Sequence, residues 1–117
     1  MRNSEGFEIK VRSPKSVAEA YAAVTKEFDP ADPEVALHPD DHAAVYSTKD
    51  GDHRIQGVIE VESEGDDSSG SVVTYGMAIE FGGTLGKIGP IRRRMAAMMQ
   101  RGVAEELEAE LDGKWFA

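Results

Sequence analysis

The fold is decided by residues 82–113, GGTLGKIGPIRRRMAAMMQRGVAEELEAELDG, in a chain of 117 residues. Pro90 suits the first position of a helix, because the missing N–H of proline has no helical partner there. Gly113 suits the position just beyond a helix, where a left-handed conformation is common. Between them lie about six turns, so we expect one long helix that crosses most of the other elements.

This helix carries an apolar stripe that does not stay on one face. Its members are Ile88, Ile91, Met95, Met98, Met99, Val103, Leu107 and Leu111. Residues 88–99 share a face, but the later members repeat every four residues and drift by roughly 40° per step on an ideal helix. We therefore expect the helix either to curve around a twisted sheet or to bend at Gly102.

The charges of the helix oppose its dipole. Arg92, Arg93 and Arg94 lie in the first turn, where negative charge is favoured, and four glutamates lie in the last two turns. We favour a solvated helix held by its packed face, since exposed charges contribute little to stability. The alternative is an anion site formed by these arginines, Lys87 and free backbone N–H groups. Three adjacent arginines cannot all face one spot on a helix, which weakens the alternative.

The first part of the chain predicts a strand, a short helix and a loop. Phe7, Ile9 and Val11 alternate with charged residues, as in a half-buried strand. Ser16 and Glu19 have the spacing of a capping box, and a helix should run from there to about Phe28. Residues 29–42, DPADPEVALHPDDH, contain three prolines and predict a loop.

Three further strands are predicted at 42–48, 54–63 and 71–81, with a tight turn at Asp50-Gly51 and a longer loop, EGDDSSG, at 64–70. The last strand has one face of large apolar residues, which should pack on the long helix: Val73, Tyr75, Met77, Ile79 and Phe81. The expected fold is one α+β domain over residues 1–117. It is an antiparallel sheet in the order β-α-β-β-β-α, packed on a long C-terminal helix.

Composition excludes several functions. The net charge of −9 and the sequence pI of about 4.7 argue against binding to nucleic acid or to an anionic membrane surface. We hypothesise that this acidity reflects a halophilic protein of a high-salt cytosol. The chain has no cysteine, so disulfides and thiolate chemistry are impossible. No apolar run approaches the roughly 18–20 residues of a membrane span, and no signal-peptide pattern precedes residue 10, so we expect a cytoplasmic protein without an integral membrane segment.

Residues 7–21, FEIKVRSPKSVAEAY, predict an alternating strand, a Ser-Pro turn and a helix that begins with an apolar residue. This segment resembles the opening of the START-like (SRPBCC) superfamily, which includes polyketide cyclases, lipid-transfer domains and Bet v 1-type proteins. Residues 83–111, GTLGKIGPIRRRMAAMMQRGVAEELEAEL, are similar to the closing segment of the superfamily members associated with carbon monoxide dehydrogenase. The order of elements also fits, in a shortened form with four strands.

The resemblance implies a curved sheet that grips the terminal helix, with an apolar ligand held between them. The residues at those positions are Tyr75, Met77, Ile79 and Phe81 on the sheet, and Ile91, Met95, Met98 and Met99 on the helix. Methionine is unbranched and polarizable, so this cluster would make an adaptable lining. The alternative, which we favour for the residues taken alone, is an ordinary core, because a small domain needs its apolar surface for stability.

Other candidate chemistry is weaker. His38, Asp40, Asp41 and His42 are suitable types of metal ligand, but Pro39 and the loop remove any helical spacing, so we expect no metal and no cofactor. The segment GGTLGK at 82–87 lacks the spacing and the Ser or Thr of a phosphate loop. The aromatic pair Trp115-Phe116 should fold back onto the core rather than dock on a partner.

Three functions remain open. The first is a non-enzymatic domain that binds a small hydrophobic molecule or lipid. The second is an interaction or structural domain with a filled core, which could form a homodimer through the open edge of its sheet. The third and least favoured is a cyclase-type enzyme, for which Glu80 or Glu106 would have to face a cavity with a perturbed pKa.

Overall fold

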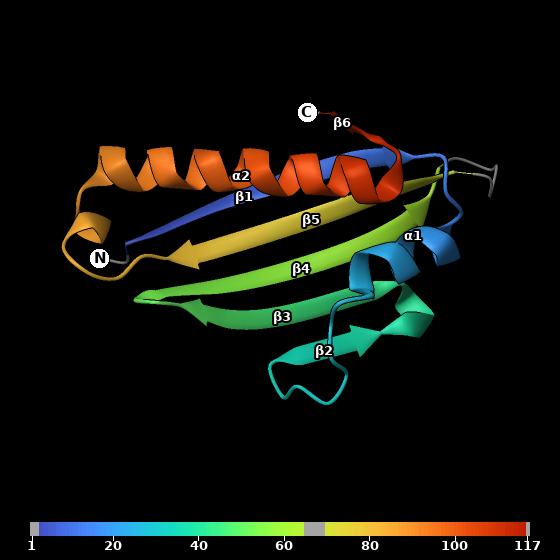
Figure 1. Ribbon diagram of the computed structural model, residues 1–117, viewed down its shortest axis with the longest axis horizontal. Helices are drawn as coiled ribbons and strands as arrows, with labels where there is room; N and C mark the ends of the chain where they lie inside the picture. Colours follow the sequence, from blue (N-terminus) through green and yellow to red (C-terminus); the bar gives the residue numbers. More distant parts are fainter. Residues whose placement is uncertain (1–2, 65–69, 117) are drawn as a thin grey trace.

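The computed structural model describes residues 3–64 and 70–116, so most of the predicted loop at 64–70 lies outside the described residues. Within that part of the chain, six antiparallel strands form one sheet in the order β2-β3-β4-β5-β1-β6 (Figure 1). The strands are β1 (Ser4–Ser13), β2 (Val35–His38), β3 (Ala43–Asp50), β4 (His53–Ser63), β5 (Ser71–Glu80) and β6 (Lys114–Phe116). The α-helices are α1 (Val17–Thr25) and α2 (Gly89–Leu111), and two short 3-10 turns cover Pro39–Asp41 and Leu85–Lys87.

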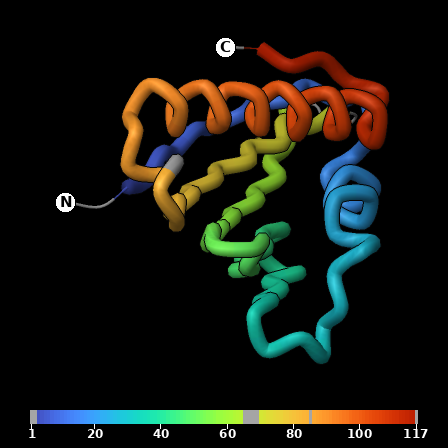
Figure 2. The backbone as a smooth tube through the Cα atoms, turned by 60° about the vertical axis from the view of Figure 1, so that its left-hand side comes forward, coloured from blue at the N-terminus to red at the C-terminus, as the bar shows by residue number. Residues whose placement is uncertain are grey.

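Alternation of apolar and polar residues orients the sheet. In β5, Val73, Met77 and Ile79 are buried, whereas Ala78 and Glu80 are exposed. The same alternation runs through β4, where Ile55, Ile59 and Val61 are buried. Both helices cover this one face, as Figure 2 shows. The predicted α+β class, the antiparallel sheet and the apolar face of the last strand are therefore confirmed.

The predicted number of four strands is wrong. Residues 29–42 are not a continuous loop, because β2 lies within them and pairs with β3 from Val35↔Tyr46 to His38↔Ala43. The three prolines of this segment fall outside Val35–His38, so none interrupts the pairing. A partner strand can thus recruit four residues that show no strong strand pattern of their own.

The chain after α2 supplies the sixth strand. Residues Lys114–Phe116 pair with β1, with Lys10↔Phe116 and Arg12↔Lys114 in register. The expected fold-back of the aromatic pair is confirmed, but it covers the edge of the sheet rather than the core. Trp115 remains exposed, and the Phe116 ring lies under the Arg12 guanidinium at 4.8 Å.

Helix α1 begins where the capping box predicts and ends earlier than expected. The Glu19 N–H donates to Ser16 Oγ at 3.2 Å, and the Ser16 hydroxyl donates to the Glu19 carboxylate at 2.9 Å. The helix stops at Thr25 instead of Phe28, because the chain closes into a turn in which Phe28 N–H donates to the Thr25 carbonyl at 3.0 Å. This turn places Phe28 over the sheet.

Helix α2 is a single helix of 23 residues that continues through Gly102. It opens at Gly89, one residue before the expected start at Pro90. Its buried face consists of Ala96, Ala104, Leu107 and Leu111. The two alanines allow the helix axis to approach the sheet closely, which explains why the buried stripe runs through them rather than through Met98.

The end of α2 differs from the prediction in detail. Asp112, with φ of 50°, takes the left-handed conformation that the sequence predicts for Gly113. Gly113 is needed for a different reason: a Cβ atom there would overlap the Arg12 carbonyl oxygen of β1. The chain must pass this close to β1 because β6 begins at the next residue.

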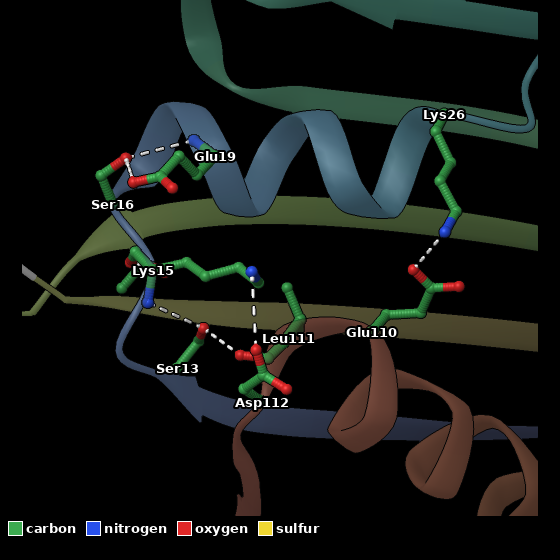
Figure 3. A network of polar contacts seen from close by, with 9 residues as sticks. Ser13, Lys15, Ser16, Glu19, Lys26, Glu110, Leu111 and Asp112 are labelled. Carbon is green, nitrogen blue, oxygen red and sulfur yellow. Dashed lines mark hydrogen bonds and ion pairs between the residues drawn. The ribbon is translucent and has the colours of Figure 1, made fainter.

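A small polar network joins the end of α2 to the start of α1 (Figure 3). The buried Ser13 hydroxyl donates to the Leu111 carbonyl at 2.6 Å and accepts from the Lys15 N–H at 3.1 Å. Ser71, also buried, donates to the Lys15 carbonyl at 2.9 Å. Since Leu111 is the last residue of α2, its carbonyl has no helical partner and this bond satisfies it.

Candidate functional site

A cleft opens between the two helices over the centre of the sheet. We call it the α1–α2 cleft. It has a volume of about 160 Å³, and its lining consists of Ala23, Val24, Lys26, Glu27, Phe28, Ile59, Tyr75, Val103, Glu106, Leu107 and Glu110. The C-terminal half of α1 and the turn after it form one wall, α2 forms the other, and β4 and β5 form the floor.

The interior of the cleft is apolar apart from one hydroxyl group. Ile59 and Leu107 are almost fully buried, and Val24, Phe28 and Val103 pack partly buried against the same core. The polar exception is Tyr75, whose hydroxyl forms a hydrogen bond with the hydroxyl of Tyr46. Apolar walls with a single hydrogen-bonding group are typical of small-molecule sites.

A glycine positions this tyrosine pair. Gly57 lies opposite Tyr46 in the β3–β4 register, and a Cβ atom at residue 57 would overlap the Tyr46 ring. The missing side chain therefore lets the ring lie across β4 and reach Tyr75 on β5. Phe28 packs against the Tyr46 ring as well, with centroids 5.3 Å apart. Tyr75 thus lines the cleft, whereas its partner Tyr46 does not.

Both phenols are held in the neutral state. Burial raises the pKa of Tyr75, and the bonded Tyr46 hydroxyl and the charge of Glu106 raise it further. Burial also raises the pKa of Tyr46, an effect that the bond to Tyr75 partly offsets. Because each phenol keeps its proton at neutral pH, the pair can offer a hydrogen-bond donor but cannot act as a base.

The mouth of the cleft is charged. Lys26 of the turn after α1 and Glu110 of α2 form an ion pair across it, with Nζ and Oε2 2.7 Å apart (Figure 3). This pair raises the pKa of Lys26, first through the hydrogen bond to Glu110. Glu27 and Glu106 also line the cleft and are exposed. The lining therefore contains one lysine and three glutamates, which gives it a net charge of −2.

Of the eight residues that sequence resemblance assigns to a ligand site, Tyr75 alone lines the α1–α2 cleft. Met77, Ile79 and Phe81 are buried in a second core cluster, with Met95 and Met99 packed against it beside Ala96. Ile91 and Met98 lie at the surface, with 36% and 70% of their area exposed. The start of α2 is therefore packed on the sheet by this cluster, and the cleft lies further along the helix, between α2 and α1.

The remaining lining residues are not assigned to a site by the sequence. Val103 and Leu107 belong to the helix stripe, and Val24 and Phe28 to the apolar face of the first helix. No local signal distinguishes a residue that lines a cleft from one that packs, because both need an apolar side chain. The sequence suggests a functional role for Glu106 only in the cyclase alternative, and in the structure this residue lines the cleft.

The arginines at the start of α2 are not equivalent. Arg92 Nε lies 3.0 Å from Glu5 Oε1 of β1, and its Nη1 donates to the Gly86 carbonyl at 3.0 Å. Arg92 is thus engaged in joining the helix to the sheet, whereas Arg93 and Arg94 are exposed. Arg92 is therefore already paired within the protein. The exposed Arg93 and Arg94 fit the interpretation of a solvated helix.

Two of the histidines, His42 and His53, make packing and hydrogen-bond contacts within the fold. The His42 ring packs edge-on against Tyr21 with centroids 5.7 Å apart, and His53 Nδ1 accepts from the Gly82 N–H at 3.2 Å. Within residues 3–64 and 70–116, no three His, Asp or Glu side chains lie close enough together to hold a metal ion. No helix in the same ranges is long and apolar enough to cross a membrane.

Comparison with known proteins identifies the fold. No protein-family description matches the chain, and no curated protein sequence does. Among solved structures, the Zhui aromatase/cyclase from Streptomyces sp. R1128 is similar over 93% of this chain and 92% of its own, with a TM-score of 0.71 and 10% identity. Ara h 8.0201 is similar over 92% of this chain and 97% of its own, with a TM-score of 0.57 and 12% identity.

A third similar structure is an Arabidopsis thaliana member of the major latex protein family. It is similar over 92% of this chain and 96% of its own, with a TM-score of 0.51 and 11% identity. These likenesses, together with the antiparallel sheet that holds a long C-terminal helix, show that the chain has the START-like, helix-grip fold that its sequence resembles.

Proposed function

We propose that this chain binds a small hydrophobic molecule in the α1–α2 cleft. The cleft itself carries the proposal, because seven of its eleven lining residues are aliphatic or aromatic and its volume is about 160 Å³. An apolar cavity of about 150 Å³ is large enough for benzene. A compound with one ring therefore fits, whereas drug-sized ligands usually occupy roughly 300–1,000 Å³. The START-like fold, shared with an aromatase/cyclase, supports a ligand between sheet and helices.

Binding without catalysis is the form of this function that the site favours. A phenol with the ordinary tyrosine pKa of 10.0 is already protonated at neutral pH, and burial raises the pKa of both Tyr46 and Tyr75 further. Glu106 is exposed to water at the mouth rather than enclosed in an apolar setting. The site can hold and orient a molecule, and its tyrosine pair can donate one hydrogen bond to it.

Two variants, each of which replaces one alanine of α1 by phenylalanine, test this proposal. Ala23 lines the cleft, and its neighbour Ala22 is exposed outside it. Ala23→Phe should fill the cleft and abolish binding of ethylbenzene, measured as chemical-shift changes at Val103 and Leu107 in an NMR titration. Ala22→Phe adds the same ring elsewhere and should leave binding intact. Circular dichroism shows whether each variant is folded.

The proposal fails if ethylbenzene does not perturb the cleft residues of the unmodified protein, or if both variants bind it equally well. A filled-core interaction domain would then be the better interpretation, since the seam near the start of α2 is already packed by Met77, Ile79 and Phe81. Strand β2 is an edge of the sheet and could pair with a second chain. Native mass spectrometry would then report the number of subunits.

A further inference from the structure

We propose that the ligand of the α1–α2 cleft is a single-ring compound that carries a protonated amine, with its ring inside the cleft and its amine at the mouth. This inference rests on the proposed function and adds the chemical class of the ligand. It follows from three features: the size of the cleft, the distribution of polar groups between its floor and its mouth, and the sign of the charge there.

The charge at the mouth selects against acids. Lys26 is the cation among the lining residues, and its ion pair with Glu110, at 2.7 Å, offsets one of the three glutamate charges; the charge of Glu27 also acts on Lys26. Glu27 and Glu106 remain, on opposite walls of the cleft. A fatty acid or another carboxylate would place a third negative charge beside these two. A protonated amine would instead lie between them, where opposite charges attract.

The field of the whole protein acts in the same direction. A net charge of −9 raises the local concentration of cations and repels anions, most strongly at a cleft whose own lining is negative.

The floor of the cleft suits the apolar ring of such a ligand. Ile59 and Leu107 are apolar, and Tyr75 offers the single hydrogen-bonding group. The cleft is thus apolar at one end and acidic at the other.

Three probes of similar shape separate the contributions. Ethylbenzene carries no charge, phenethylamine carries one positive charge at pH 7, and phenylacetate carries one negative charge. We expect phenethylamine to bind about two- to fivefold more tightly than ethylbenzene for each unpaired glutamate that it approaches. Phenylacetate should bind more weakly than either. Raising the salt concentration should reduce the preference for the amine, because salt screens exposed charges.

A pair of substitutions on α2 assigns the effect to the cleft. Glu106→Gln should reduce the affinity ratio of phenethylamine to ethylbenzene by about two- to fivefold. Glu105→Gln removes the same charge from an exposed position that does not line the cleft, so it should leave the ratio unchanged. Both variants keep the length of the side chain, and the comparison cancels the change in net charge.

The outcomes distinguish this inference from the proposed function. If ethylbenzene binds in the cleft as tightly as phenethylamine, or if phenylacetate binds more tightly, the amine class is wrong and a hydrophobic-ligand site remains. Equal effects of the two glutamine variants would also overturn it, because the preference would then reflect net charge alone. If none of the three probes binds, the proposed function is wrong as well.

Discussion

Gly57 provides the sharpest test of how the site is built. Its missing side chain makes room for the Tyr46 ring, which crosses β4 to reach Tyr75. In a Gly57→Ala variant the new methyl group would overlap that ring, which must then leave its position over the strand. Inserting a methyl group into a packed interior costs about 1–3 kcal/mol. For a domain of this length that corresponds to a fall in Tm of about 4–12 °C.

Gly76 is the matched control. It lies in β5, two strands from Tyr46, and a Cβ atom there would meet no other atom within 4 Å. Gly76→Ala should therefore stabilise the protein by about 0.5–1 kcal/mol, since alanine loses less freedom on folding than glycine. Urea unfolding of both variants measures the difference. It should be about 1–3 kcal/mol, the cost of the overlap alone, because the gain from replacing a strand glycine by alanine applies to both variants and cancels.

A double variant tests the cause. When Tyr46 is already alanine, adding Gly57→Ala should no longer destabilise the protein and should act like Gly76→Ala, because the ring that it would overlap is absent. The two changes should thus be strongly non-additive. The reasoning is refuted if Gly57→Ala is tolerated as well as Gly76→Ala, or if it costs the same with and without the Tyr46 ring.

Three further results are expected. Ser13→Ala should destabilise the protein by about 1–3 kcal/mol in urea unfolding, because the Leu111 carbonyl and the Lys15 N–H lose a common partner, whereas Ser16→Ala at the exposed cap should cost only about 1 kcal/mol. Stability should fall as the pH rises above the ordinary tyrosine pKa of 10.0, since the unfolded phenols lose protons that the folded ones retain, and Tyr75→Phe should make this fall shallower in alkaline unfolding curves. Melting temperature should rise with salt if the net charge of −9 reflects adaptation to a high-salt cytosol, and a melting temperature indifferent to salt would contradict that hypothesis.

Periodicity in the sequence predicts the elements that depend on local pattern. The strand at 71–81 alternates so regularly that its buried face can be assigned without coordinates, and the capping box at Ser16 marks the start of α1. The start of the long helix is predicted to within one residue. These predictions succeed because side-chain period and capping chemistry are properties of residues close together in the chain.

Strands β2 and β6 cannot be predicted in this way. Each has only three or four residues, and each exists because a longer neighbour offers unpaired backbone groups. The left-handed turn at Asp112 is a similar case. Conformational preference predicts the left-handed conformation at Gly113. In the structure Asp112 takes that conformation, and glycine is needed at 113 because β1 passes too close for a side chain.

The position of the cleft could not be predicted from local sequence pattern. The sequence alone determined that a methionine- and aliphatic-rich helix would lie on the large face of an antiparallel sheet, because each element carries its own apolar pattern. Only the tertiary structure decided where a cleft remains. Ala96 packs with Met77 and Ile79 near the start of α2, and Ala104, Leu107 and Leu111 are buried near its end, so the opening lies beside this second cluster, between α1 and α2. The position of the opening depends on the distance between elements, which no local pattern encodes.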